Sequence, residues 1–186
     1  ETTPKQKVDR VKMFGGDFIK IVLFGDNFDD AQKEAQKQIN DNTIFIHPFD
    51  DITVIEGQGT IALEILDQID KHFDYLIIPI GGGGLISGII TVFNKLSPKT
   101  KIIGVEAEGA PAMFKSLEQK KIIELNKIDN FVDGVSIKKI GKIPFEICKA
   151  HLDDLLVIPE GKICQTILDL YNKDGIVVEP AGAIGI

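Results

Sequence analysis

Short apolar runs alternate with amphipathic segments along most of the chain. Runs rich in Ile, Val and Phe are typical of buried strands, and apolar residues three and four positions apart are typical of one helix face. We predict strands over residues 18–24, 43–46, 74–80, 101–106, 155–158 and 176–178. We predict helices over residues 4–14, 29–40, 61–69, 85–96, 112–118, 145–151 and 160–171, with another beginning at Glu179-Pro180. This alternation predicts an α/β fold with mainly parallel sheets flanked by helices.

A break in the pattern suggests two domains. The segment His47-Pro48-Phe49-Asp50-Asp51 interrupts regular structure, as Pro and Asp clusters commonly do. We therefore place a boundary there, with residues 1–46 forming part of a small α/β domain and residues 47–186 most of a larger one. His47, beside a proline in a loop, is interpreted as a solvated histidine.

Four consecutive glycines, Gly81 to Gly84, follow the apolar strand 74–80 and precede a helix. Glycine lets the backbone turn sharply, and several N–H groups can then converge at the positive end of the helix dipole. Such a loop favours the binding of a phosphate. The alternative without a ligand is a strained strand-to-helix turn.

Two nucleotide-binding motifs resemble this loop. A P-loop requires Gly-Lys-Ser/Thr, but Leu85-Ile86-Ser87 follows the glycines, so this motif is excluded. A Rossmann dinucleotide site stays open, because Gly82, Gly84 and Gly88 form a variant of its glycine pattern and Glu106 ends the next strand.

Composition and charge narrow the partners. The chain is 44% hydrophobic and 26% charged, with a formal net charge of −7. Because basic residues are scattered among more numerous acidic ones, we expect no nucleic-acid partner. The longest apolar stretch, 75–90, contains a proline and five glycines, so we expect no membrane span and a cytoplasmic protein. Cys148 and Cys164 lack a C-x-x-C spacing and are interpreted as reduced, packed thiols.

Five motifs in order along the chain resemble the threonine dehydratase (threonine ammonia-lyase) family. They are residues 2–8 (TTPKQKV), 57–60 (GQGT), 81–85 (GGGGL), 133–135 (DGV) and 179–182 (EPAG). This family belongs to the fold-type II pyridoxal-phosphate enzymes, which are similar to the tryptophan synthase β subunit. Serine racemase is a close relative within this fold and stays open as an alternative function.

The resemblance implies a site for pyridoxal 5'-phosphate. In this family, the tetraglycine loop and the residue after it hold the cofactor phosphate. The implied phosphate-binding residues are Gly81, Gly82, Gly83, Gly84 and Leu85. Gly134 and Glu179 match positions beside the cofactor ring. For Glu179, a carboxylate that stabilises a helix start is the alternative role.

The resemblance also implies the reaction and what this chain lacks. The expected reaction is deamination of L-threonine, and usually of L-serine, to a 2-oxo acid and ammonia. The resemblance also implies a role in isoleucine biosynthesis and an oligomeric full-length protein. The Schiff-base lysine of the family would precede Glu1, and further cofactor contacts would follow Ile186. We therefore assign no catalytic residue within the chain, which is incomplete at both ends, and expect the chain alone to be inactive.

One departure from related enzymes concerns a metal site. Serine racemases and some relatives bind a divalent cation through a Glu, a carbonyl four residues later and an acid six residues later. The matching positions here are Glu106, Ala110 and Ala112. Because an alanine supplies no carboxylate, we predict no such site.

Overall fold

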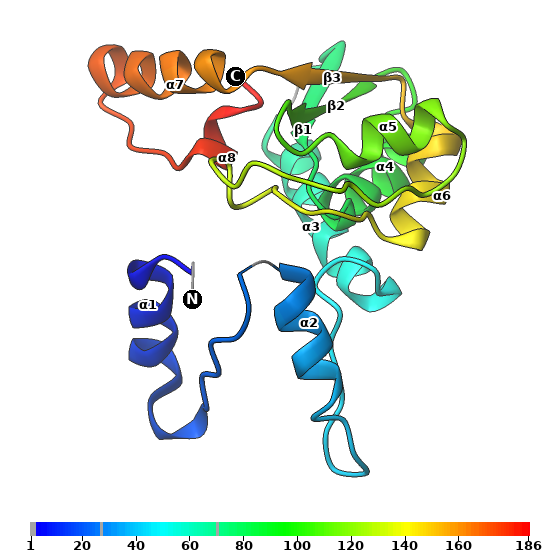
Figure 1. Cartoon of the computed structure of the whole chain (residues 1–186). Helices are drawn as coiled ribbons and strands as arrows, with labels where there is room; N and C mark the ends of the chain where they lie inside the picture. Colours follow the sequence, from blue (N-terminus) through cyan, green and yellow to red (C-terminus); the bar gives the residue numbers. More distant parts are fainter. Residues whose placement is uncertain (1–2, 27, 70) are drawn as a thin grey trace. The chain divides into compact units, whose positions relative to one another are not determined.

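The computed structural model describes residues 3–26, 28–69 and 71–186. The chain divides into two compact units, Glu1–Ile46 and His47–Ile186. Their elements are labelled in Figure 1, and each unit is described by itself.

Two α-helices form the main regular structure among the described residues of the first unit. Helix α1 (Lys5–Gly15) has Pro4 at its N-cap and is followed by a short 3-10 turn, Gly16–Phe18. Helix α2 (Phe28–Gln36) ends earlier than the predicted residue 40.

The two strands predicted for this unit are wrong. Residues 18–24 and 43–46 do not form strands. Among the described residues of this unit, β-type pairing is limited to one isolated antiparallel bridge between Asn40 and Thr43. Apolar runs predict strands only where a neighbouring strand is available to pair with them. Val22, Phe24 and Ile44 are accordingly exposed.

The second unit contains a three-stranded parallel sheet. Strands β1 (Tyr75–Pro79), β2 (Lys101–Ala107) and β3 (Asp154–Ile158) lie in the order β1-β2-β3. The register pairs Pro79 with Val105 and Ala107 with Ile158. Because the strands are parallel, their carboxyl ends meet at one edge of the sheet, and the glycine loop lies there.

Six helices accompany the sheet in the described part of this unit. They are α3 (Ile52–Gln68), α4 (Gly84–Leu96), α5 (Ala112–Glu118), α6 (Lys142–His151), α7 (Glu160–Asp169) and α8 (Pro180–Ala183), with a π-helical turn at Leu170–Asp174 after α7. Figure 1 shows α7 and α8 on one side of the strands and α4, α5 and α6 on the other. A parallel sheet flanked by helices confirms the predicted fold class.

Two element predictions for this unit were wrong. Helix α3 begins at Ile52, nine residues before the predicted position 61, because Asp51 accepts hydrogen bonds from the N–H groups of Thr53 and Val54. This side-chain cap starts a helix that continues through Gly57 and Gly59. Residues 176–178 form no strand, and Val177 is 83% exposed.

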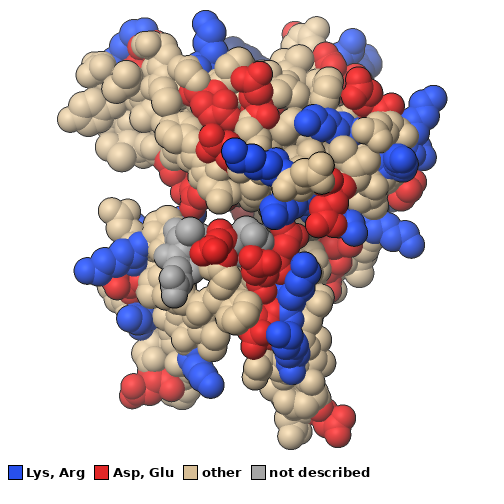
Figure 2. All heavy atoms as spheres, viewed as in Figure 1, with Lys and Arg blue, Asp and Glu red and all other residues tan. Residues whose placement is uncertain are grey.

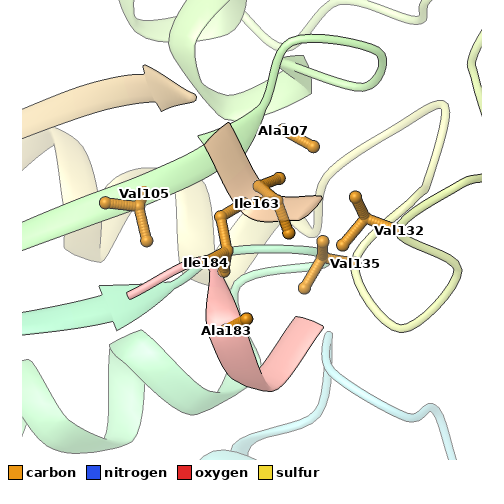
Figure 3. Packing of buried hydrophobic residues seen from close by; sticks show 7 residues of the cluster. All are labelled: Val105, Ala107, Val132, Val135, Ile163, Ala183 and Ile184. Atoms are coloured by element: carbon orange, nitrogen blue, oxygen red, sulfur yellow. The ribbon is translucent and has the colours of Figure 1, made fainter. Parts of the chain in front are cut away.

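One buried cluster joins the end of β2 to α7 and α8. Figure 3 shows its members pointing toward one another: Val105, Ala107, Val132, Val135, Ile163, Ala183 and Ile184. Each Å² of apolar surface removed from water contributes about 25 cal/mol to the stability of such a cluster. It therefore holds the connection around Val135 against the carboxyl edge of the sheet.

The cysteines differ in their surroundings. Cys148 on α6 is buried, as predicted, whereas Cys164 on α7 is exposed, so the prediction of a packed thiol there is wrong. Ile163 occupies the inward position of that helical turn, which turns its neighbour outward.

The visible surface mixes charges of both signs. Figure 2 shows basic side chains interspersed with acidic ones on the face in view. Among the residues that the structure describes, no helix is long and apolar enough to cross a bilayer.

Candidate cofactor-phosphate site

The tetraglycine loop leaves a row of backbone donors without protein acceptors. Helix α4 begins at Gly84, after Gly83 with φ +93°. Within the described part of the chain, the N–H groups of residues 81–85 make no hydrogen bond, and the first helical bond runs from Ser87 N to the Gly83 carbonyl at 3.1 Å. Buried or half-buried donors require partners, and a helix N-terminus favours a negative one. An anion such as a phosphate fits this donor set.

Ser87 reinforces the start of the helix. Its side chain is fully buried, and its hydroxyl donates to the Gly83 carbonyl at 2.6 Å. The same carbonyl therefore accepts from both the backbone and the side chain of Ser87. This pair of bonds fixes Gly83 in its left-handed conformation, which few residues other than glycine adopt.

Two glycines of the loop lie against segments that are distant in sequence. A Cβ placed on Gly81 would lie 3.0 Å from the Val135 Cα, and one on Gly83 would lie 2.5 Å from the Pro144 Cβ. The Gly82 carbonyl also accepts a hydrogen bond from Gly141 N at 3.2 Å. Glycine is thus required for close packing as well as for the turn.

The other two glycines lie against Phe49. A Cβ on Gly84 would lie 3.0 Å from the Cβ of Phe49, and a Cβ on Gly82 would overlap the Phe49 ring. This contact was missed from the sequence, where 47–51 was interpreted as an interrupting loop. The signal that could have revealed it is the Asp51 cap, which makes this segment the start of α3.

The structure brings the remaining predicted cofactor residues to the same place. Gly134 adjoins Val135, which contacts Gly81, and a Cβ on Gly134 would lie 3.1 Å from Oε1 of Glu179 and 2.8 Å from the Ala181 Cβ. Glu179 occupies the N-cap position of α8, with Pro180 at N1, and its side chain makes no cap hydrogen bond. Its carboxylate therefore lies beside Gly134 without bonding the amides of the helix start.

Glu106 has a structural role in this chain. Its buried carboxylate accepts hydrogen bonds from Met113 N at 2.8 Å and Phe114 N at 2.7 Å, at the start of α5. Burial raises the pKa of Glu106 to about 7, although these two hydrogen bonds lower it. The carboxylate is thus engaged within the protein. Ala110 and Ala112 add no carboxylate beside it, and the absence of a metal site stays a prediction.

Cys148 lies near this carboxylate. Burial, and secondarily the charge of Glu106, raise the pKa of the Cys148 thiol to about 12. The thiol is therefore neutral at physiological pH and unsuited to nucleophilic or metal-binding roles.

The dinucleotide alternative does not fit this geometry. Gly88 packs against α3, where its added Cβ would lie 2.5 Å from both Gly59 N and the Ile55 carbonyl oxygen. Close packing of α4 against α3 therefore accounts for a glycine at position 88. Glu106, the candidate ribose-binding acid, is occupied by the start of α5.

Curated relatives match the whole chain. L-threonine dehydratase biosynthetic IlvA from Halalkalibacterium halodurans is 56% identical over 186 residues, which is 100% of this chain and 45% of that protein. The Bacillus subtilis protein of the same name is 48% identical and is covered over 44% of its length. The chain therefore spans about half the length of the curated relatives that it matches.

Solved structures also match nearly the whole chain. Processed threonine deaminase isoform 2 from Solanum lycopersicum superposes with a TM-score of 0.87 at 40% identity, over 99% of this chain and 50% of that one. Maize serine racemase has a TM-score of 0.88 at 31% identity, over 100% of this chain and 55% of that one. The family described as pyridoxal-phosphate dependent enzyme matches residues 1–186. This chain belongs to the pyridoxal-phosphate-dependent enzyme family.

Proposed function

We propose that this chain forms the cofactor-phosphate site of an L-threonine dehydratase. The observation that carries the proposal is the row of unbonded N–H groups over residues 81–85 at the start of α4. A dianionic phosphate complements these donors in both charge and geometry. The relatives named L-threonine dehydratase, which match the chain over its whole length, support this reaction.

Each predicted site residue has a place in this proposal. Gly81, Gly82, Gly83, Gly84 and Leu85 hold the phosphate through their backbone N–H groups. Gly134 and Glu179 lie beside the cofactor ring, and the absence of a side chain on Gly134 lets Glu179 and Ala181 approach closely. When bound, pyridoxal phosphate supplies an electrophilic carbon and a ring that withdraws electrons from the substrate Cα. The residues of this chain hold and orient it.

The two compact units fit the proposed domains. We assign residues 1–46 to the latter part of the small domain and residues 47–186 to most of the large, phosphate-binding domain. The full-length protein is proposed to be a cytoplasmic homo-oligomer that converts L-threonine to 2-oxobutanoate and ammonia in isoleucine biosynthesis, and to act on L-serine as well.

Serine racemisation is the second candidate. The maize serine racemase structure favours it, because it matches this chain as well in shape as the threonine deaminase does. The lower identity, 31% against 40%, favours the dehydratase.

The test compares both activities in one preparation. The full-length protein that carries this chain is incubated with pyridoxal phosphate and with L-threonine or L-serine. We expect 2-oxobutanoate from threonine, with D-serine formed much more slowly than 2-oxo acid. If D-serine forms faster than either 2-oxo acid, the protein is a serine racemase. If neither D-serine nor a 2-oxo acid forms, both functions are refuted.

A further inference from the structure

The segment 47–51 is internally braced. Nδ1 of His47 accepts hydrogen bonds from Asp50 N at 2.9 Å and from Phe49 N at 3.3 Å. Asp51 caps α3 through Thr53 N at 2.8 Å. The segment is therefore fixed to a long helix rather than free to move as a loop.

Phe49 transmits this rigidity to the glycine loop. The half-buried Phe49 ring meets the His47 ring edge to face, with centroids 4.6 Å apart and planes at 83°. Phe49 also lies directly against Gly82 and Gly84: a Cβ on Gly82 would overlap its ring, and one on Gly84 would lie 3.0 Å from its Cβ. One aromatic side chain thus contacts two of the four glycines.

A second link comes from Asp50. Its Oδ1 accepts from Ile143 N at 2.9 Å, across 93 positions of sequence. The same residue lies against Gly141, whose N–H donates to the Gly82 carbonyl. Each of three segments therefore contacts the other two: the glycine loop at 81–84, residues 47–51 and residues 141–144.

We propose that Phe49 is a positioning residue for the phosphate site, held in place by His47 and Asp50. It acts by fixing the peptide planes of Gly82 and Gly84, and hence the directions of the N–H groups that receive the phosphate. This inference rests on the proposed function. A loss of positioning weakens binding through the phosphate and leaves the rest of the cofactor's contacts intact.

The test separates phosphate binding from general stability. Affinities for pyridoxal phosphate and for pyridoxal, which lacks the phosphate, are measured by spectroscopic titration of the full-length apoprotein. The variants are Phe49→Leu and Phe49→Met, with Phe93→Leu as the matched control. Phe93 is 1% exposed at the far end of α4, against Phe73, so its substitution lowers stability away from the loop.

We expect both Phe49 variants to weaken pyridoxal phosphate binding by about tenfold or more, with less than about a threefold change for pyridoxal, since small misplacements of aligned groups have large effects. Phe93→Leu lowers the melting temperature and leaves the ratio of the two affinities unchanged. Asp50→Asn, which weakens the link to Ile143, changes the ratio in the same direction as the Phe49 variants.

Each outcome decides something. If the wild-type protein prefers pyridoxal phosphate and the Phe49 variants keep that preference, the positioning role is refuted while the proposed function stands. If the wild-type protein binds both compounds equally, the phosphate site itself is wrong, and the inference fails with it. If one Phe49 variant does not fold, the other gives the ratio.

Discussion

At the scale of single residues, the site depends on what glycine lacks and on what fills the space. The sequence alone indicated that four glycines in a row favour a phosphate, and the unbonded N–H groups support that interpretation. It could not indicate that Phe49 and Pro144 lie against these glycines. Contacts between residues so far apart in sequence are set by tertiary packing, which no local pattern contains.

The buried carboxyl of Glu106 makes the stability of the fold depend on pH. Burial raises its pKa from 4.5 to about 7, so the folded protein binds this proton more tightly than the unfolded chain does. Stability from this group is therefore full below pH 4.5 and is lost as pH rises to 7, by roughly 3 kcal/mol. Glu106→Gln removes the titration.

The difference in unfolding free energy between Glu106→Gln and wild type isolates this group from all others. We expect that difference to move in favour of the variant by roughly 3 kcal/mol between pH 4.5 and 8 in urea denaturation. A difference that stays constant across this range would show that the carboxyl does not titrate there.

At the scale of elements, four glycines inside helices fall into two kinds. Gly57 and Gly161 lie in α3 and α7 with no atom within 4 Å of an added Cβ. Gly59 and Gly88 are instead the contact between α3 and α4, with Gly88 fully enclosed. The helices predicted from the sequence include Gly88 and Gly161 but leave Gly57 and Gly59 outside the helix predicted from Ile61. That is why the predicted start of α3 was too late.

This contrast predicts opposite effects for one substitution. Gly57→Ala raises the free energy of unfolding by roughly 0.5–1 kcal/mol, since alanine restricts the unfolded chain and no atom obstructs its methyl group. Gly88→Ala lowers it by about 1–3 kcal/mol, because the methyl group forces α3 and α4 apart. Chemical denaturation of both variants checks this pair. Equal effects of the two would contradict the packing described between these helices.

At the scale of the whole molecule, the sequence predicted the sheet region well and the first unit poorly. Residues 101–106 and 155–158 are strands because each has a parallel neighbour. Residues 18–24 have comparable apolar character but no ladder partner among the described residues, and they form no strand. Pairing depends on which other segments are present, so apolar character alone could not distinguish the two cases.

Binding of the cofactor phosphate by the tetraglycine loop is tested most directly at Gly83. Its φ of +93° and its contact with Pro144 both disfavour a side chain, whereas Gly161 tolerates one. The measurement is the affinity of the full-length apoprotein for pyridoxal phosphate. We expect Gly83→Ala to weaken it by about tenfold or more, with Gly161→Ala unchanged. Equal affinities in the two variants would contradict the assignment of the phosphate to this loop.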